Sequence, residues 1–242
     1  LQQHIDSGAD VTIAYTREEI PKALRDIDVT KKDLYYTLDI DAEGRVQKIV
    51  VNNKESGEHN VSMNIYVIER QLLMDQIRQA YVNGLTYFER DIIAPQLEEL
   101  NVKAYQHDGY YARILDINTY FAENMKMLKE ENVNALFSPN PVYTKIRDDN
   151  PTRYAAGSHA KNVMAADGCV IEGEVENSIL FRGVRIGKGA KVRNCVLMQD
   201  TVIETGATVE YAITDKNVKI SAYKELKGTD SFPVFVEKRK NV

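Results

Sequence analysis

Branched apolar residues recur every six positions between residues 163 and 220, separated mainly by polar residues and glycine. The clearest six-residue units begin at Ile186, Val192, Ile203 and Val209. Four positions after each start stands a small or β-branched residue, namely Ala190, Val196, Ala207 or Ile213. This period predicts a left-handed parallel β-helix, in which three units form one triangular coil and the leading side chains stack inside. The alternative is an antiparallel all-β domain with turns at Gly187, Gly189 and Gly206.

The coil length is not a whole multiple of six. Ile186 and Ile203 are 17 residues apart, one fewer than three units. We therefore expect a tightened corner near residues 199–201. The repeat weakens before Leu180, where residues 170–173 fit it only loosely.

Residues 1–132 alternate between short apolar runs and longer amphipathic stretches, which is the pattern of an α/β domain. We expect strands at 11–15, 33–38, 46–51, 62–68, 102–106 and 110–114. We expect helices at 1–7, 70–82, 87–100 and 118–129. The tetrapeptide Asp41-Ala-Glu-Gly44 predicts a hairpin turn between the second and third strands.

Three prolines, Pro139, Pro141 and Pro151, mark a change in the chain after this α/β pattern. The predicted organisation is an α/β domain at 1–132, a linker at 133–162, and a β-helix at 163–242 that ends in a capping strand. The fold class is therefore α/β followed by a left-handed parallel β-helix.

Composition narrows the classes of partner. The net charge of −5 over 242 residues argues against nucleic acid, because phosphate binding needs a basic face. No apolar run approaches the roughly 20 residues of a membrane helix, and no signal peptide is visible. Two cysteines, Cys169 and Cys195, do not make a disulfide framework, so we expect a cytoplasmic protein. Because the chain begins at Leu1, we expect the parent protein to have residues before it.

The four histidines do not indicate a metal site. His4, His59, His107 and His159 are scattered without metal-ligand spacing. Many hexad-solenoid proteins are acyltransferases that use a histidine projecting from a coil as general base. Residues 163–220 contain none, so a hexapeptide-repeat acyltransferase is only a minor alternative.

Several short motifs point to one family. They are Gly8-Ala-Asp-Val-Thr-Ile-Ala, Gly44-Arg-Val, Ser62-Met-Asn-Ile-Tyr-Val, Arg90-Asp-Ile-Ile-Ala-Pro, Gly109-Tyr-Tyr, Tyr120-Phe-Ala-Glu-Asn and Val209-Glu-Tyr-Ala-Ile-Thr. Together they resemble the sugar-nucleotide pyrophosphorylases, most closely the glucose-1-phosphate adenylyltransferase (ADP-glucose pyrophosphorylase) family. The resemblance spans nearly the whole chain. It implies the C-terminal portion of a nucleotidyltransferase domain, with a Rossmann-like mixed sheet, joined to a β-helix. The N-terminal part of that domain, with its glycine-rich phosphate loop and a catalytic aspartate, would lie before Leu1.

The chain departs from the family where sugar phosphate should bind. The family has a Glu-Lys-Pro run whose lysine meets the phosphate, and this chain has Val51-Asn52-Asn53 there. An asparagine cannot supply that positive charge, although Lys54 could substitute for it. The resemblance thus leaves Asn52, Lys54 and Ser62 as residues of a vestigial substrate pocket. Asn64 and Glu89 stand where the family has glycines, and we expect both to crowd this pocket.

The metal position departs as well. At the corresponding place the family has the sequence Gly-Tyr-Trp-Arg-Asp-Val-Gly-Thr, whose aspartate coordinates Mg²⁺. In this chain Arg113 aligns with that aspartate. A cation at this point repels a divalent ion. Asp116 would point away from the site on a strand. We therefore expect no catalytic residue, no metal and no cofactor in this chain, with Mg²⁺ only on a catalytic partner.

These losses favour a non-catalytic regulatory subunit, of which paralogues are known in the family. The implied partner is the catalytic glucose-1-phosphate adenylyltransferase subunit in a homo- or hetero-tetramer of bacterial glycogen synthesis, with the β-helix serving assembly. The basic end Lys238-Arg239-Lys240 could receive an anionic sugar-phosphate effector, with Arg147, Arg153 and Lys161 as neighbours. Two alternatives stay open: the full-length protein is itself an active nucleotidyltransferase, or it is a pure scaffold.

Overall fold

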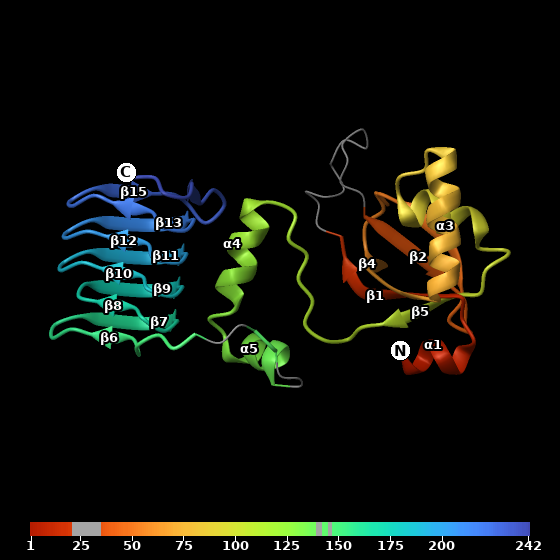
Figure 1. The fold of residues 1–242 in the computed structure, drawn as a ribbon, viewed down its shortest axis with the longest axis horizontal. Coiled ribbons are helices and arrows are strands. Elements are labelled where there is room, and N and C mark those ends of the chain that lie inside the picture. The colour runs from red at the N-terminus through yellow and green to blue at the C-terminus, as the bar shows by residue number, and fades with distance from the viewer. Residues whose placement is uncertain (21–34, 139–141, 145–146) are drawn as a thin grey trace. The chain divides into compact units, whose positions relative to one another are not determined.

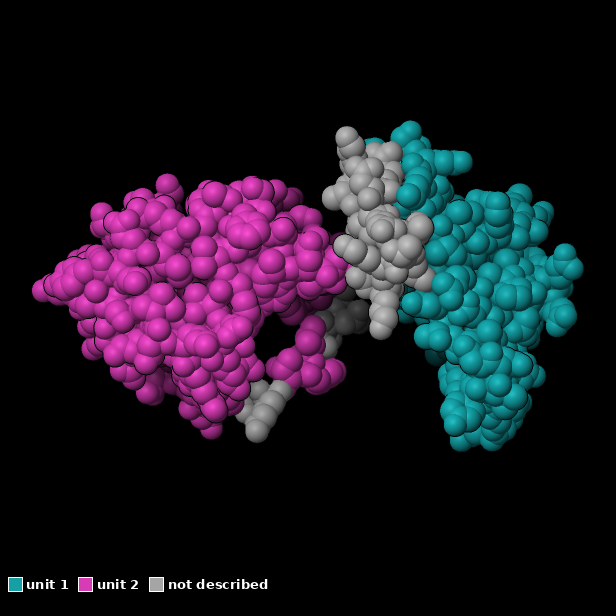
Figure 2. Space-filling view, turned by 90° about the horizontal axis from the view of Figure 1, so that it is seen from above, with its two compact units in different colours: residues 1–109 teal, residues 110–242 magenta. Residues whose placement is uncertain are grey.

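A computed structural model describes residues 1–20, 35–138, 142–144 and 147–242 (Figure 1). The chain divides into two compact units, residues 1–109 and residues 110–242 (Figure 2). The predicted fold class, an α/β domain followed by a left-handed parallel β-helix, is confirmed.

Unit 1 is built on a mixed sheet whose described strands have the order β3-β2-β4-β1-β5. The strands are β1 (Val11–Glu19), β2 (Tyr36–Ile40), β3 (Val46–Val51), β4 (Glu58–Ile68) and β5 (Val102–Gln106). β5 runs parallel to β1, whereas the other neighbours pair antiparallel. Val11 and Ile13 are both fully buried and belong to one hydrophobic cluster, because alternate side chains of a strand share a face.

The helices of unit 1 end where the sequence places left-handed glycines. α1 (Gln2–Ser7) stops at Gly8, whose φ is 58°, and α3 (Arg70–Asn83) stops at Gly84, whose φ is 66°. At the start of α3, the carboxylate of Glu69 accepts a hydrogen bond from the amide of Leu72 at 2.9 Å. The expected helices at 1–7 and 70–82 are thereby confirmed, as is the hairpin between β2 and β3. Asp33 and Leu34, the start of the expected strand at 33–38, lie outside the described residues.

The expected α-helix at 87–100 is wrong. The chain forms a π-helical turn, η1 (Phe88–Ile93), followed by a short 3-10 helix, η2 (Ala94–Gln96). Pro95 has no amide hydrogen, and its ring clashes with the carbonyl four residues earlier, so an α-helix cannot continue through it. The carboxylate of Asp91 also accepts the amides of Thr86 and Tyr87, at 3.1 and 2.9 Å, which fixes the entry to the turn.

Unit 2 contains the β-helix, whose strands all pair in parallel. One sheet holds two-residue strands: β6 (Arg153–Tyr154), β8 (Val170–Ile171), β10 (Arg185–Ile186), β12 (Val202–Ile203) and β14 (Lys219–Ile220). The other holds β7 (His159–Ala165), β9 (Glu174–Leu180), β11 (Lys191–Leu197), β13 (Thr208–Thr214), β15 (Glu225–Lys227) and β16 (Val234–Val236). Figure 1 shows the coils stacked in order from β6 to the C-terminus. The buried isoleucines at 171, 186, 203 and 220 lie in register and form one column of the interior.

The shortened part of the coil is not where the sequence pattern placed it. Ile186, Val192, Leu197 and Ile203 all belong to the interior core, so successive steps are six, five and six residues. The short step therefore lies between Val192 and Leu197, and not at residues 199–201. Asn194 turns the chain there with a φ of 52°, a left-handed conformation that asparagine tolerates better than most side chains.

Two of the residues that stand four positions after the start of a unit, Val196 and Ile213, do not belong to the interior core of the coil. Val196 and Ile213 are buried in a separate cluster together with Phe121 of α4 (Ile117–Lys126). The five-residue step puts Leu197 inside, and its neighbour Val196 then faces the opposite side of the strand. The helix expected to end the first domain thus packs on the β-helix.

This packing moves the predicted domain limits. Residues 110–132 fall in unit 2 rather than in an α/β domain at 1–132. The segment 133–162, predicted as a linker, contains the end of α5 (Glu130–Phe137), all of β6 and the start of β7. The first coil therefore begins at Arg153 rather than at residue 163. Pro139 and Pro141 lie outside the described residues.

The expected strand at 110–114 does not form, and these residues lead into α4. The phenol of Tyr110 donates a hydrogen bond to the carboxylate of Glu123 at 2.7 Å, which ties this segment to the helix. No helix in the described parts of the chain is both long and apolar enough to cross a bilayer.

Candidate functional site

Asn52, predicted to line the vestigial pocket, is a brace between two backbone segments. Its side-chain oxygen accepts the amide of Tyr35 at 3.0 Å, and its own amide donates to the carbonyl of Tyr35 at 2.9 Å. It has a φ of 48° and is 8% exposed. Its carboxamide oxygen therefore has a structural role at the end of β3, where it holds the backbone of Tyr35.

Lys54 lies in the loop between β3 and β4 and is exposed. The loop is held by Asn53, whose side-chain oxygen accepts the amide of Glu55 at 3.0 Å and whose side-chain nitrogen lies 3.2 Å from the hydroxyl of Thr37. Lys54 forms no hydrogen bond or ion pair with any described residue. Its ammonium group therefore extends into solvent.

Ser62 is fully buried in β4, and its hydroxyl donates a hydrogen bond to the carboxylate of Glu89. The same carboxylate oxygen accepts the phenol of Tyr66 at 2.8 Å. Glu89 comes from the π-helical turn η1 and is only 1% exposed. The hydroxyl predicted to face a sugar is thus bound to a side chain of the protein itself.

The buried carboxylate changes the acidity of the phenols around it. Burial, followed by the charge of Glu89, raises the pKa of Tyr66 well above its ordinary value. The same two causes raise the pKa of Tyr36 to about 12. Tyr66 therefore stays protonated at neutral pH and remains a donor to Glu89.

Asn64 and Glu89 were both expected to crowd the pocket, and of the two side chains only that of Glu89 bonds to Ser62. Asn64 is exposed and has a φ of 57°, which explains how it replaces a glycine. It sits in a β-bulge, because Ala14 pairs with Ile65 while the next residue, Tyr15, pairs with Ser62. Glu89, in contrast, reaches the buried hydroxyl of Ser62.

Arg113 belongs to unit 2, whereas Asn52 and Ser62 belong to unit 1. Its Nε donates a hydrogen bond to the phenol oxygen of Tyr111 at 3.1 Å. Among the residues with described placement, no group of three or more His, Cys, Asp or Glu side chains is arranged to hold a metal ion.

Asp116 was expected on a strand and is instead the N-cap of α4. Its carboxylate accepts the amide of Thr119 at 2.7 Å, and its own amide donates to the Thr119 hydroxyl at 2.9 Å. The hydrogen bond from the Thr119 amide holds the pKa of Asp116 below its ordinary value. This capping box assigns the carboxylate a structural role.

The basic residues Lys238, Arg239 and Lys240 are exposed in the turn after β16. The carbonyl of Lys240 accepts the amide of Lys219, so this turn lies beside β14 in the last coil. Arg153 and Lys161 stand on β6 and β7 of the first coil. The order β14-β12-β10-β8-β6 separates the two ends by four strand spacings, or about 19 Å. The structure therefore does not bring the expected effector residues together, and Arg147 pairs with Asp149 at 3.0 Å instead.

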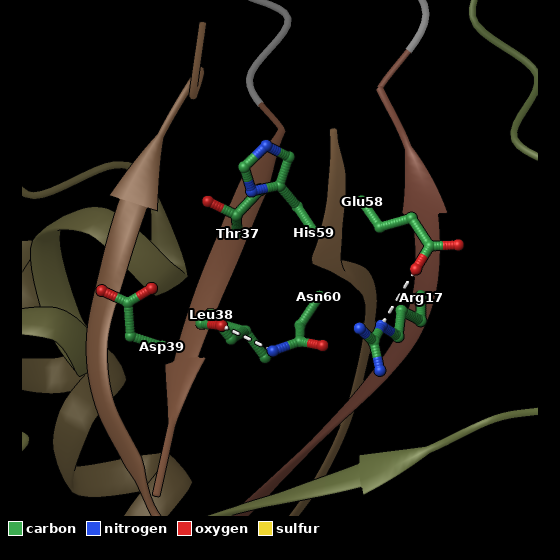
Figure 3. Close-up of a pocket in the computed structure, with 7 residues that line it drawn as sticks. All are labelled: Arg17, Thr37, Leu38, Asp39, Glu58, His59 and Asn60. Carbon is green, nitrogen blue, oxygen red and sulfur yellow. Dashed lines mark hydrogen bonds and ion pairs between the residues drawn. The ribbon is translucent and has the colours of Figure 1, made fainter. Parts of the chain in front are cut away.

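Sequence reasoning missed a shallow hollow of about 360 Å³ on the sheet of unit 1 (Figure 3). Its walls come from β1, β2 and β4 and consist of Arg17, Thr37, Leu38, Asp39, Glu58, His59 and Asn60. Arg17 is already paired with Glu58 at 3.3 Å, and Asn60 donates to the carbonyl of Leu38 at 3.1 Å. None of the three predicted pocket residues lines it. A second hollow, of about 420 Å³, lies on the face of the β-helix around Arg185 and Gly187.

The solenoid of unit 2 and the mixed sheet of unit 1 define the class of the chain. Residues 145–231 match the family model described as GlmU-like, C-terminal hexapeptide. The chain thus combines a mixed α/β sheet with a hexapeptide-repeat β-helix.

Curated relatives narrow this class. The chain is 35% identical over 195 residues to the glycogen biosynthesis protein GlgD of Bacillus subtilis, covering 80% of this chain and 57% of the relative. It is 38% identical over 132 residues to the GlgD of Geobacillus stearothermophilus, covering 54% of this chain and 38% of the relative. It is 31% identical over 219 residues to the glucose-1-phosphate adenylyltransferase of Clostridium perfringens, covering 84% of this chain and 51% of that enzyme. The predicted resemblance to the glucose-1-phosphate adenylyltransferase family is confirmed, and the chain spans about half the length of the curated relatives it matches.

Proposed function

We propose that this protein is a regulatory or assembly subunit in glycogen biosynthesis, which supports ADP-glucose synthesis by a separate catalytic chain and is itself catalytically deficient. The names of its relatives support the process, since they include glycogen biosynthesis proteins and glucose-1-phosphate adenylyltransferases. The reaction that it would modulate joins ATP and glucose 1-phosphate.

The observation that carries this proposal is the bond between Ser62 and Glu89. Ser62 is inaccessible to solvent, and its hydroxyl proton is directed at a carboxylate that also holds Tyr66. A sugar phosphate could reach Ser62 only by displacing a buried negative charge. Because the substrate is also an anion, Coulomb repulsion adds to the steric barrier.

Two further features support the same reading. The carboxamide oxygen of Asn52 accepts a hydrogen bond from the backbone amide of Tyr35. Arg113 carries a positive charge where the resembling enzymes have a metal-binding carboxylate, and Asp116 is committed to capping α4. We therefore assign Mg²⁺ to the catalytic partner and propose no cofactor for this chain.

We further propose a cytoplasmic homo- or hetero-tetramer whose other member is the catalytic adenylyltransferase subunit. The flat parallel faces of the β-helix suit assembly, because regular strand faces pack over large areas. An anionic effector bound at Lys238, Arg239 and Lys240 stays a prediction. If present, it must bind without Arg153 and Lys161, which lie on the first coil.

Mixing the full-length protein with its catalytic paralogue, with ATP, Mg²⁺ and glucose 1-phosphate present, tests the proposal. We expect a change in the rate of ADP-glucose formation or in its dependence on substrate concentration, and no turnover by this protein alone. If neither the rate nor its substrate dependence changed, the regulatory role would be wrong and the protein would be only a scaffold. Turnover by this protein alone that Lys54→Ala abolishes, while Lys48→Ala on the exposed side of β3 does not, would identify an active enzyme instead.

A further inference from the structure

Two backbone irregularities meet at the contact between Ser62 and Glu89. β4 carries a bulge directly after Ser62, where Asn64 adopts a φ of 57° and donates its amide to the Ser62 hydroxyl oxygen at 3.2 Å. Glu89 stands in the π-helical turn η1. Bulges and π-helical turns both concentrate beside ligand sites, because they re-aim side chains that regular strands and helices would point elsewhere. Their convergence on one buried carboxylate points to a ligand site.

The donors around the carboxylate are fixed in advance. The Ser62 oxygen accepts the amide of Asn64, so its own proton is free for Glu89. The ring of Tyr66 is held edge-on by Phe88, with centroids 5.0 Å apart and planes inclined by 67°. Both hydroxyl donors belong to β4 and converge on one oxygen, Oε1 of Glu89. Two preset hydroxyl donors aimed at a single oxygen specify an acceptor of negative charge.

We propose that Glu89 is an internal ligand: its carboxylate occupies an oxyanion pocket formed by Ser62 and Tyr66 and closes that pocket to small carboxylates from solution. Shortening the side chain to alanine removes a CH₂–COO⁻ group, which acetate matches in size and charge. The pocket then takes acetate as its occupant.

The test uses thermal unfolding of the intact protein, as Glu89→Ala, Glu89→Gln and wild type, in sodium acetate and in sodium chloride of equal ionic strength at pH 7. In chloride we expect Glu89→Ala to melt roughly 10 °C below wild type, because one buried and one half-buried hydroxyl donor lose their acceptor. Acetate should raise the Tm of Glu89→Ala saturably. At ten times its Kd it multiplies the folding equilibrium constant about 11-fold. Wild type and Glu89→Gln, whose pockets are filled, should melt identically in both salts.

Matched variants locate the effect. Adding Ser62→Ala to Glu89→Ala should abolish the difference between acetate and chloride. Adding Ser7→Ala, whose hydroxyl bonds the His4 carbonyl in α1, should leave it intact. A folded Glu89→Ala that melts at the same temperature in both salts would overturn the proposal. A Glu89→Ala that stays unfolded in both salts would overturn it too, because the residue would then be a core element and not an occupant.

This inference rests on the proposed function only in placing Ser62 in a closed pocket. Acetate dependence is measured on this protein alone, whereas the regulatory role is measured on a mixture with the catalytic paralogue. Loss of the acetate effect would therefore leave the kinetic result standing, and the reverse also holds.

Discussion

The ring of Phe121 in α4 lies 6.5 Å, centroid to centroid, from the ring of Tyr211 in β13, with the two planes inclined by 51°. Tyr211 stands at the corner position that Asn194 occupies one coil earlier, and it has a φ of 50°. A left-handed tyrosine is strained, since its Cβ approaches the following backbone. Packing against α4 offsets this strain and fastens the helix to the solenoid.

Truncating this contact should release α4. Phe121 is 2% exposed and packs on Val196 and Ile213, so we expect Phe121→Ala to lower the free energy of unfolding of unit 2 by about 3 kcal/mol. Hydrogen exchange of the amides in α4 should accelerate more than that of β11. Phe137→Ala, an exposed aromatic in α5, is the matched control and should change neither. Equal protection of α4 in Phe121→Ala and wild type would contradict this role.

Charge alternates along one outward column of the β-helix. The column runs through Lys161, Glu176, Arg193, Glu210 and Lys227, which are neighbours in register. Nε of Arg193 lies 3.4 Å from a carboxylate oxygen of Glu176, and Nη1 of Arg193 lies 3.6 Å from a carboxylate oxygen of Glu210. Because the Arg193 side chain is 44% exposed, we expect Arg193→Met to cost only about 0.5 kcal/mol. Chemical unfolding in urea should show this difference at 0.05 M NaCl and lose most of it at 1 M, whereas a difference independent of salt would point to packing instead.

Neighbouring coils approach closely at Gly187. A Cβ there would lie 2.8 Å from the amide nitrogen of Thr205, so Gly187→Ala must push two coils apart. We expect it to lower the free energy of unfolding by about 3 kcal/mol. Gly189→Ala is the control, since Gly189 has a φ of 69° but open space around it, and strain alone should cost about 1 kcal/mol. Comparable urea midpoints for the two variants would show that the coils can separate without cost.

Acid should weaken the start of α4. The pKa of Asp116 in the folded protein lies below its ordinary value because of the hydrogen bond from the Thr119 amide. A lowered folded pKa contributes stability above the unfolded pKa, near 4, and that contribution disappears as pH falls through the folded value. Thermal melts from pH 6 to pH 2 should therefore show a smaller acid loss for Asp116→Asn than for wild type. Asp116→Ala should lose about 1 kcal/mol near neutral pH, where the ionised carboxylate caps the helix, and less at pH 2, where wild type has lost that contribution as well.

The six-residue pattern was sufficient to predict the β-helix and the pairing of its coils. Ile186 and Ile203 are 17 residues apart and do lie side by side in β10 and β12. The location of the short step was beyond the pattern, because Val196 and Leu197 are both apolar and either could lead a unit. Contact with α4 makes Val196 an outward residue, and no periodicity within the solenoid contains that information.

The candidate site was only partly predictable for a similar reason. Motif spacing marked Asn52, Ser62 and Glu89 as departures or remnants of a substrate pocket. It could not show that Asn52 braces Tyr35, or that Asp116 begins a helix, because these roles depend on hydrogen bonds to the backbone.

The sequence by itself determined the repeat, its parallel stacking and the glycine stops of α1 and α3, since these depend on residues that are near one another along the chain. Only the tertiary structure decided which group the Ser62 hydroxyl binds. Its partner Glu89 is 27 residues away and reaches it through a bulge in β4 and a π-helical turn. Burial of a carboxylate between two hydroxyl donors is a property of that folded arrangement, because water would satisfy all three groups in an open chain.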